Sequence, residues 1–325
     1  MTDYRTLIDD ETWAFIDRTN SFYPPDTIDY TIDQQREVYN RMCREFFTGY
    51  PDGVTAETKF IKAAEGHEIP IRHYRAEQNA PQAVVLYSHG GGFVVGGLES
   101  HDDVCAEICH RTGYDVVSVD YRLAPEHKHP ASFNDCMTAF NWVAGTFDLP
   151  IVLAGDSAGG NLSAAVAHHT RSHPRKPVGQ MLIYPGLGGD ITRGSYVTHA
   201  EAPMLTMRDL VFYKDIRTGG KDHSRDISYV PLSDPDFSDL PPTIVITAEC
   251  DPLSSDGEAY RDVLLAAGVK AWWHEDAGLV HGHLRARHSV ARARESFSRI
   301  VESIRTLGSK EWGHPLPAEV NPGRQ

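Results

Sequence analysis

Short apolar runs recur along the middle and C-terminal parts of the chain, and several are continuous rather than alternating. A continuous run of this length is typical of a strand buried on both faces of a sheet. The predicted strands lie at 83–87, 115–119, 151–154, 180–184, 243–247 and 270–274. Segments with helical periodicity separate them, at 100–112, 132–145, 159–172, 256–267 and 284–306. Strands that alternate with helices predict an α/β fold, with a mostly parallel central sheet flanked by helices on both faces.

Both ends of this alternating region have their own patterns. Two extended runs between Glu57 and Arg75 flank the sequence Glu65-Gly66-His67, which predicts a β-hairpin. At the other end, the tail from Gly308 onward is rich in glycine and proline, and we expect it to be loosely ordered.

Two further segments lack the strand and helix alternation. Residues 1 to 50 have the pattern of amphipathic helices, which Pro24-Pro25 interrupts. The interval from Gly186 to Pro231 is rich in loops and has one helical piece at 207–216. An insertion there follows the carboxyl end of a strand, where α/β sheets place their ligands. We therefore expect it to form lid or substrate-binding material.

Composition and charge narrow the possible partners. The chain has 325 residues, 41% of them hydrophobic, which allows one large domain or a domain with an appended lid. Its formal net charge is −14 and it has no long basic run. Nucleic acid is therefore not expected as a partner, because phosphate binding needs clustered Lys and Arg. The N-terminus lacks the features of a signal peptide and no apolar stretch reaches the ~18 residues of a membrane span, so a cytoplasmic protein is expected.

The five cysteines do not predict a disulfide framework, because their number is odd and their spacing scattered. Cys105 and Cys109 lie four residues apart in a predicted helix. We interpret them as two buried thiols on one helical face rather than as a metal or redox pair.

Ser157 is the strongest candidate for a nucleophile. It lies in Gly155-Asp156-Ser157-Ala158-Gly159, between a predicted buried strand and a helix rich in small residues. A serine on such a sharp turn needs unusual backbone angles and close chain contacts, which glycine at both flanking positions allows. The following helix directs its N-terminal partial positive charge toward a developing oxyanion.

A glycine-rich loop supplies candidate oxyanion donors. The sequence Ser88-His89-Gly90-Gly91-Gly92-Phe93 directly follows a predicted strand. Consecutive glycines expose backbone N–H groups, so the amides of Gly91 and Gly92, together with that of Ala158, are expected to form an oxyanion hole. We expect His89 to shape this loop rather than to transfer protons.

Asp251 and His281 complete a candidate triad with Ser157. Each follows a predicted strand, and the order Ser, Asp, His is the one expected for such a sheet. His283 competes with His281 for the role of the base. The spacings His281-Gly-His283 and His127-Lys-His129 also allow metal pairs, but no carboxylate or thiol pattern nearby completes a site, so no metal is expected. His168, His169 and His173, at the end of a predicted helix, are interpreted as solvated.

These motifs together resemble those of the hormone-sensitive-lipase-like esterases of the α/β-hydrolase fold. The matching segments are H-G-G-G-F at 89–93, Y-R-L-A-P-E at 121–126, G-D-S-A-G-G-N at 155–161, D-P-L at 251–253 and H-G at 281–282. The resemblance implies Ser157 as nucleophile, His281 as general base and acid, Asp251 as its orienting partner, and no cofactor. Where the family usually has an aromatic residue after His-Gly, this chain has His283.

The resemblance also implies a helical cap. The expected division has residues 1–55 and 187–230 as the two parts of the cap, and 56–186 with 231–325 as the catalytic domain. Phe93, Val94, Val95 and His283 are expected to line the substrate pocket. The oligomeric state stays open in the sequence, and because similar esterases are often dimers, a homodimer is one candidate.

The predicted function is the hydrolysis of small carboxylic esters with short to medium acyl groups, acetyl to hexanoyl, through an acyl-enzyme. Two alternatives stay open. One is a ligand-binding module without catalysis, as in plant gibberellin receptors, which resemble this family but lack the catalytic histidine. The other is an amidase or peptidase that uses the same triad on a different bond.

Overall fold

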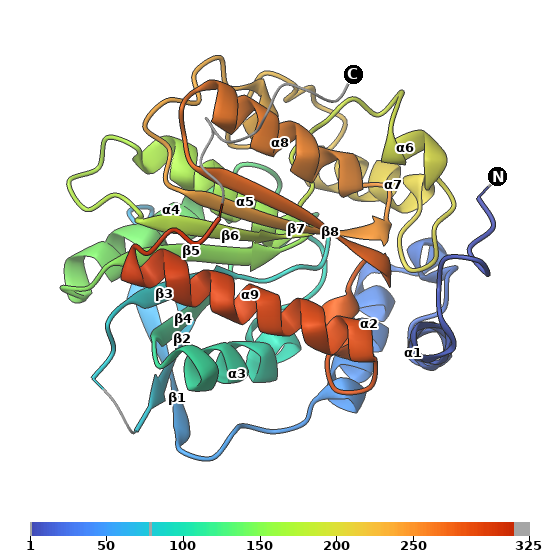
Figure 1. The fold of residues 1–325 in the computed structure, drawn as a ribbon, viewed down its shortest axis with the longest axis horizontal. Helices are drawn as coiled ribbons and strands as arrows, with labels where there is room; N and C mark the ends of the chain where they lie inside the picture. Colours follow the sequence, from blue (N-terminus) through green and yellow to red (C-terminus); the bar gives the residue numbers. More distant parts are fainter. Residues whose placement is uncertain (1, 78–79, 315–325) are drawn as a thin grey trace.

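An eight-stranded sheet forms the centre of the molecule (Figure 1), as seen in a computed structural model that describes residues 2–77 and 80–314. The strand order is β1-β2-β4-β3-β5-β6-β7-β8. The first two strands pair antiparallel, as do β2 and β4, and the remaining neighbours are parallel. The strands are β1 (Val54–Lys62), β2 (Glu68–Ala76), β3 (Val84–Ser88), β4 (Asp115–Val119), β5 (Ile151–Asp156), β6 (Gly179–Ile183), β7 (Thr243–Cys250) and β8 (Ala271–Val280).

Helices cover both faces of this sheet. Apolar side chains of α4 (Ala131–Thr146), α5 (Ala158–Thr170) and α8 (Ser254–Ala266) pack in one core cluster with sheet residues. Those of α3 (Asp102–Thr112) and α9 (Ala291–Ser309) pack in a second cluster on the other face, which is the near face in Figure 1. Two layers of helices around a mostly parallel sheet confirm the predicted fold class.

The burial of the strands explains why their sequences differ. Every residue of β3, β4, β5 and β6 is buried, which accounts for their continuous apolar runs. Strand β1 lies at the sheet edge and is mostly exposed or half-buried. The predicted hairpin is present, with Ile61 of β1 opposite Ile69 of β2.

In the C-terminal region, the predicted start of the last helix and the predicted start of the loose tail are both wrong. The helix predicted at 284–306 is a short 3₁₀ helix, η4 (His283–Ala286), followed by a turn and then by α9. The carbonyl of Ala286 accepts hydrogen bonds from the backbone N–H groups of Ser289 and Val290, which closes that turn. Gly308, predicted to begin a loose tail, lies inside α9 and packs close to Tyr114. The rest of that prediction falls partly on residues 315–325, which lie outside the described residues.

His168 is buried, which corrects the prediction of a solvated side chain. Its Nδ1 lies 2.6 Å from Asp234 Oδ2, and its Nε2 lies 2.9 Å from the hydroxyl oxygen of Tyr260. The ring of Phe237 also packs edge-on against it. The segment around 234–237 therefore covers the end of α5, an arrangement that the local sequence of α5 does not encode.

The remaining helices are α1 (Asp10–Phe22), η1 (Thr27–Asp29), α2 (Ile32–Phe46), η2 (Leu98–His101), α6 (Ser195–Thr198), α7 (Met207–Thr218) and η3 (Pro231–Ser233). Of these, α1, α2, α6 and α7 lie near the carboxyl ends of the parallel strands (Figure 1). Within residues 2–77 and 80–314, no helix combines the length and the apolar character needed to cross a bilayer.

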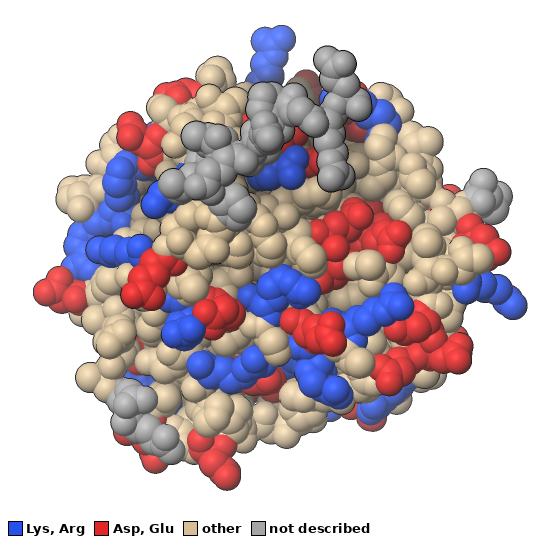
Figure 2. Space-filling view, viewed as in Figure 1, with Lys and Arg blue, Asp and Glu red and all other residues tan. Residues whose placement is uncertain are grey.

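Acidic and basic side chains are interspersed on the face covered by α3 and α9, as Figure 2 shows. Some of the charged side chains of α9 form ion pairs with each other, such as Arg305 with Glu302 at 2.6 Å. This face therefore has a mixed charge pattern rather than a patch of one sign.

Candidate active site

Ser157 occupies the turn between β5 and α5 in a strained conformation. Its φ is 54° and its ψ is −117°, in a region that residues other than glycine seldom adopt. A Cβ at Gly155 would collide with the carbonyl of Gly159, and one at Gly159 would collide with the carbonyl of Ser88. Glycine is therefore required at both flanking positions by contact between neighbouring chain segments, as the sequence pattern predicts.

His281 connects Ser157 with Asp251. Its Nε2 lies 2.8 Å from Ser157 Oγ and its Nδ1 lies 2.7 Å from Asp251 Oδ2. A carboxylate only accepts hydrogen bonds, so Nδ1 carries the proton and Nε2 is left to accept from the serine hydroxyl. The structure therefore brings together the three residues that the sequence analysis selected from the ends of three strands.

Asp251 is held rigidly beneath the histidine. Its side chain is fully buried, and its Oδ1 accepts a hydrogen bond of 2.9 Å from the backbone N–H of Leu253. The His281 side chain is 13% exposed, which leaves it open to the cavity above Ser157. The carboxylate is thus isolated from solvent, whereas the imidazole is not.

The glycine loop directs backbone amides toward Ser157. Gly91 and Gly92 have φ values of 123° and 60°, and a Cβ at Gly91 would collide with the carbonyl of Val95. Gly91, Gly92 and Ala158 all line the same cavity as Ser157. Among the described residues, none of their three amides has a hydrogen-bond acceptor. All three are therefore free to donate to a bound group.

His89 stabilises the glycine loop through stacking and hydrogen bonds. Its ring stacks on Tyr121 with centroids 4.2 Å apart, and its Nδ1 lies 2.7 Å from the carbonyl oxygen of Gly90. The Tyr121 hydroxyl donates to the His89 carbonyl oxygen at 2.7 Å. Burial lowers the pKa of His89 to about 4, so the ring is neutral near pH 7.

Asp156 anchors the loop from the side of the sheet. Its Oδ1 accepts from the Tyr87 hydroxyl at 2.8 Å and from the Gly90 amide at 3.0 Å, while its Oδ2 lies 3.2 Å from His101 Nε2. Against the effect of burial, His101 and the hydroxyl of Tyr87 hold the pKa of Asp156 well below its usual range. The residue before Ser157 therefore fixes the relative position of the glycine loop and the nucleophile turn.

A cavity of about 210 Å³ opens above Ser157. Segments 1–55 and 187–230 both contribute to its walls. The residues that line it are Thr19, Tyr23, Tyr39, Met42, Gly91, Gly92, Phe93, Val95, Asp156, Ser157, Ala158, Asn161, Tyr184, Gly186, Met204, Leu205, Leu210, Tyr213, Lys214, Arg217, Tyr229, Leu253, His281, Gly282 and Arg285.

Two of the four expected pocket residues do not line this cavity. Phe93 and Val95 do, but Val94 is fully buried in the apolar cluster beneath the N-terminal helices. His283 is 1% exposed, and its Nε2 lies 2.9 Å from Ser296 Oγ. The reason is local: Gly282 adopts a left-handed conformation with φ 76°, and η4 then turns His283 away toward α9. The expectation for Val94 and His283 is therefore corrected.

Several cavity residues were not selected by the sequence analysis. Tyr39 and Met42 lie three residues apart on α2, and Tyr213 and Arg217 lie four apart on α7. Their helical spacing is a signal that each pair shares a face. The sequence does not say which face of a cap helix turns toward the sheet, so it does not distinguish cavity residues from packing residues.

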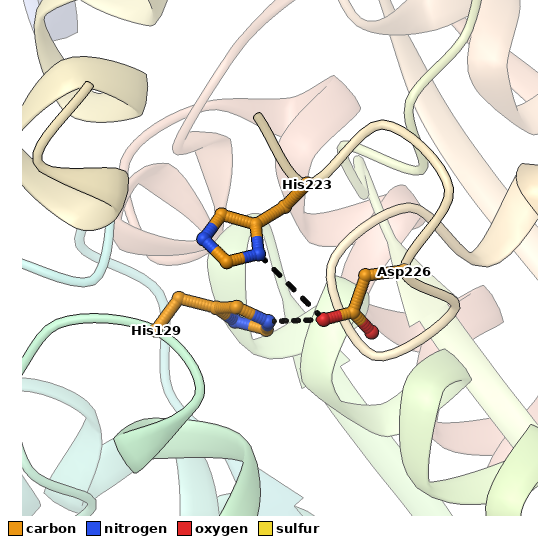
Figure 3. A group of neighbouring side chains, drawn as sticks. All are labelled: His129, His223 and Asp226. Atoms are coloured by element: carbon orange, nitrogen blue, oxygen red, sulfur yellow. Dashed lines mark hydrogen bonds and ion pairs between the residues drawn. The ribbon is translucent and has the colours of Figure 1, made fainter. Parts of the chain in front are cut away.

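His129, His223 and Asp226 form a compact group (Figure 3), and the ring of His129 packs against that of Tyr229 in the cavity wall. His129 Nε2 lies 2.9 Å from Asp226 Oδ2, and His223 Nδ1 lies 3.8 Å from the same oxygen. One donor atom from each lies within 4.8 Å of the others, a spacing that one metal ion could occupy. The group joins the loop before α4 to the segment 187–230. His127, the neighbour considered in the sequence, is not a member.

Comparisons with known proteins agree with these features. A family model described as alpha/beta hydrolase fold matches residues 85–285. The chain is 39% identical over 238 residues to esterase LipI of Mycobacterium tuberculosis (strain ATCC 25618 / H37Rv), a match that covers 70% of this chain and 74% of that protein. It is 38% identical over 298 residues to carboxylesterase NlhH of the same strain, covering 86% and 91%.

Two solved structures similar to this chain are named as an esterase and an ester-hydrolase. A Pyrobaculum calidifontis esterase in a monoclinic crystal form superposes with a TM-score of 0.81 at 34% identity, covering 86% of this chain and 94% of that one. The ester-hydrolase EH1AB1 from the metagenome of Lake Arreo, in complex with a phosphonate derivative, has a TM-score of 0.85 at 28% identity.

Proposed function

This chain belongs to the alpha/beta hydrolase fold family, in its hormone-sensitive-lipase-like branch, and we propose how it hydrolyses carboxylic esters. It is a serine ester hydrolase, and its relatives at 32–39% identity are named as an esterase, a carboxylesterase and an ethyl acetate hydrolase. We propose Ser157 as the nucleophile, His281 as the general base and acid, and Asp251 as its orienting carboxylate. The observation that carries the proposal is the pair of short contacts that His281 makes with Ser157 and Asp251.

The proposed reaction has two steps. Ser157 Oγ attacks the carbonyl carbon of the ester while His281 Nε2 takes the hydroxyl proton, and Asp251 stabilises the imidazolium that forms. The tetrahedral intermediate collapses, and His281 gives the proton to the leaving alcohol. A water molecule then attacks the acyl-enzyme with His281 as base, which releases the acid and restores Ser157.

The oxyanion of each tetrahedral intermediate is proposed to bind the amides of Gly91, Gly92 and Ala158. The N-terminus of α5 adds its partial positive charge at the same point. Donors of this kind typically contribute about 3 kcal/mol each to the stability of the transition state. This contribution is specific to the transition state because the negative charge is absent from the substrate carbonyl.

Small acyl groups, acetyl to hexanoyl, are the proposed substrates. The size of the cavity, about 210 Å³, supports this range. An ethyl acetate hydrolase of Pseudomonas putida is 32% identical to this chain over 256 residues, and its name describes activity on one such ester. A series of 4-nitrophenyl esters tests the range, since a maximum at twelve carbons or more would contradict it.

We further propose that the protein is cytoplasmic and forms a homodimer. The five cysteines are all free and buried, which supports a reducing compartment. Sedimentation of the purified protein tests the dimer.

The test of the catalytic assignment is the Ser157→Ala variant. Loss of 4-nitrophenyl butyrate hydrolysis with an unchanged melting temperature supports the proposal, whereas full turnover would overturn it. Matched ester and amide substrates, compared in the wild-type protein, test the alternative of an amidase.

A further inference from the structure

Cationic side chains outnumber carboxylates in the wall of the cavity. Lys214, Arg217 and Arg285 all line it, whereas Asp156 is the one carboxylate among its described lining residues. Asp156 is already engaged by the contacts that hold the glycine loop. The chain as a whole has a net charge of −14. The cavity wall therefore carries an excess of positive side chains, although the chain as a whole is negatively charged.

Arg217 is the most unusual of these cations. It is 4% exposed, and its guanidinium lies between two aromatic rings, 3.5 Å from the ring centroid of Phe93 and 4.3 Å from that of Tyr229. Its side chain donates a hydrogen bond of 3.2 Å to Asn161 Oδ1. Among the described residues its buried Nε has no acceptor, and no carboxylate forms an ion pair with it.

An unpaired charge in such a place is costly, because burial removes water without supplying an opposite charge. Burial lowers the pKa of Arg217 to about 10, which still leaves it protonated at pH 7. The two aromatic rings offset part of the cost through cation–π contacts. Asp226 is a nearby carboxylate, but it is held by His129 and Ser228.

Elsewhere this chain pairs a buried arginine with carboxylates. Arg287 is 3% exposed, and its guanidinium lies 2.6 Å from Asp103 Oδ2 and 2.8 Å from Glu107 Oε2. Arg217 differs from Arg287 in facing the substrate cavity. A negatively charged group of a bound substrate can therefore pair with Arg217.

We propose that Arg217 binds a carboxylate at the far end of the acyl group, so that half-esters of short dicarboxylic acids are the preferred substrates. This inference rests on the proposed function. Phe93, which contacts Arg217, follows the oxyanion loop and lines the cavity above Ser157, so we place the acyl group of the bound ester beside these two residues. A guanidinium recognises a carboxylate through paired charge-assisted hydrogen bonds, a geometry that an alkyl terminus cannot match.

Two esters of the same shape test this preference. Monoethyl glutarate ends in a carboxylate, and ethyl 5-methylhexanoate ends in an uncharged isopropyl group of similar size. Hydrolysis of both is followed in a pH-stat at pH 8. We expect kcat/KM to be at least about tenfold higher for the half-ester, and we expect this ratio to fall as the salt concentration rises.

Variants test whether Arg217 is the residue that causes the preference for the half-ester. Arg217→Met should lower the ratio of the two kcat/KM values to one or below, and Arg217→Lys should retain part of it. Arg208→Met is the matched control, because Arg208 lies on the same helix but pairs with Asp29 outside the cavity. That variant should keep the wild-type ratio. Competitive inhibition of 4-nitrophenyl butyrate hydrolysis by glutarate gives a second measurement that needs no variant.

The possible outcomes separate this inference from the proposed function. If the neutral esters are hydrolysed but the half-ester is not preferred and glutarate does not inhibit, the inference is overturned and the esterase proposal stands. An unchanged ratio in Arg217→Met also overturns it. If no ester is hydrolysed at all, the proposed function fails, and protection of the protein by glutarate against thermal unfolding then tests Arg217 alone.

Discussion

His281 Nδ1 lies 2.7 Å from Asp251 Oδ2, and the carboxylate that accepts this hydrogen bond is completely buried. The contact fixes both the orientation of the imidazole and the nitrogen that carries its proton. Because Asp251 also accepts from the Leu253 amide, its position does not depend on the substrate. The histidine is therefore set for proton transfer before an ester binds.

The first prediction concerns Asp251→Asn. The amide keeps the shape of the carboxylate but can donate to Nδ1, which favours the wrong tautomer of His281. We expect kcat for 4-nitrophenyl butyrate to fall on the order of 10³- to 10⁴-fold. Asp262→Asn, an exposed change on α8, is the control and should leave kcat unchanged. A loss of less than tenfold in Asp251→Asn would contradict the assigned role.

A second prediction concerns the glycines around Ser157. Gly159→Ala places a Cβ against the carbonyl of Ser88, so the turn must shift. We expect it to destabilise the fold by about 1–3 kcal/mol or more and to abolish turnover. Gly145→Ala is the matched control, because Gly145 lies in α4 with nothing within 4 Å of an added Cβ. That change should be neutral or stabilise by up to about 1 kcal/mol. Urea denaturation of both variants measures the difference.

A third prediction follows from the burial of His168. Burial lowers its pKa to about 4, despite its contact with Asp234. In the unfolded chain His168 binds a proton at its usual pKa near 6.5, whereas in the folded protein it does so only near pH 4. The contribution of neutral His168 to the free energy of unfolding is therefore fully present above pH 6.5 and is lost as the pH falls toward 4. The stability advantage of the wild-type protein over His168→Gln should therefore shrink across that window, by up to about 3 kcal/mol.

Urea denaturation of both proteins between pH 7.5 and 4.5 measures that difference. Comparing the two proteins cancels the titration of other groups, such as Asp256, whose pKa burial raises to about 6. A difference that stays constant with pH would contradict the account of His168.

A fourth prediction concerns the contact between His129 and Asp226. Asp226→Ala removes the partner of a buried imidazole and weakens the connection between the loop before α4 and the segment 187–230. We expect a loss of about 1–3 kcal/mol in the free energy of unfolding. Asp222→Ala, a change in the same segment, should cost less than about 0.5 kcal/mol. Equal losses in the two variants would show that the contact with His129 is unimportant.

The sequence predicted the parts of the site that depend on strand order. Ser157, Asp251 and His281 each follow a parallel strand, and such strands share one edge for their carboxyl ends, so chain order alone places the three residues together. The glycines at 155 and 159 were predictable for a similar reason, since a tight turn between strand and helix leaves no room for a Cβ.

The remaining features depend on how loops and cap helices turn. His283 was expected in the pocket wall because it stands where the resembling family usually has an aromatic residue, but the left-handed Gly282 directs it toward α9. The burial of His168 depends on Asp234 and Tyr260, which are distant in sequence. Arg217 belongs to a helix whose orientation toward the sheet no local pattern specifies.

Covalent labelling of Ser157 is the most direct test of the central claim. The wild-type protein is treated with a fluorophosphonate, and intact-mass and peptide analysis give the number and position of the labels. We predict one label per chain on Ser157, with slow or no labelling in His281→Ala. A label on another residue, or equal labelling of Ser157→Ala, would contradict the proposed mechanism.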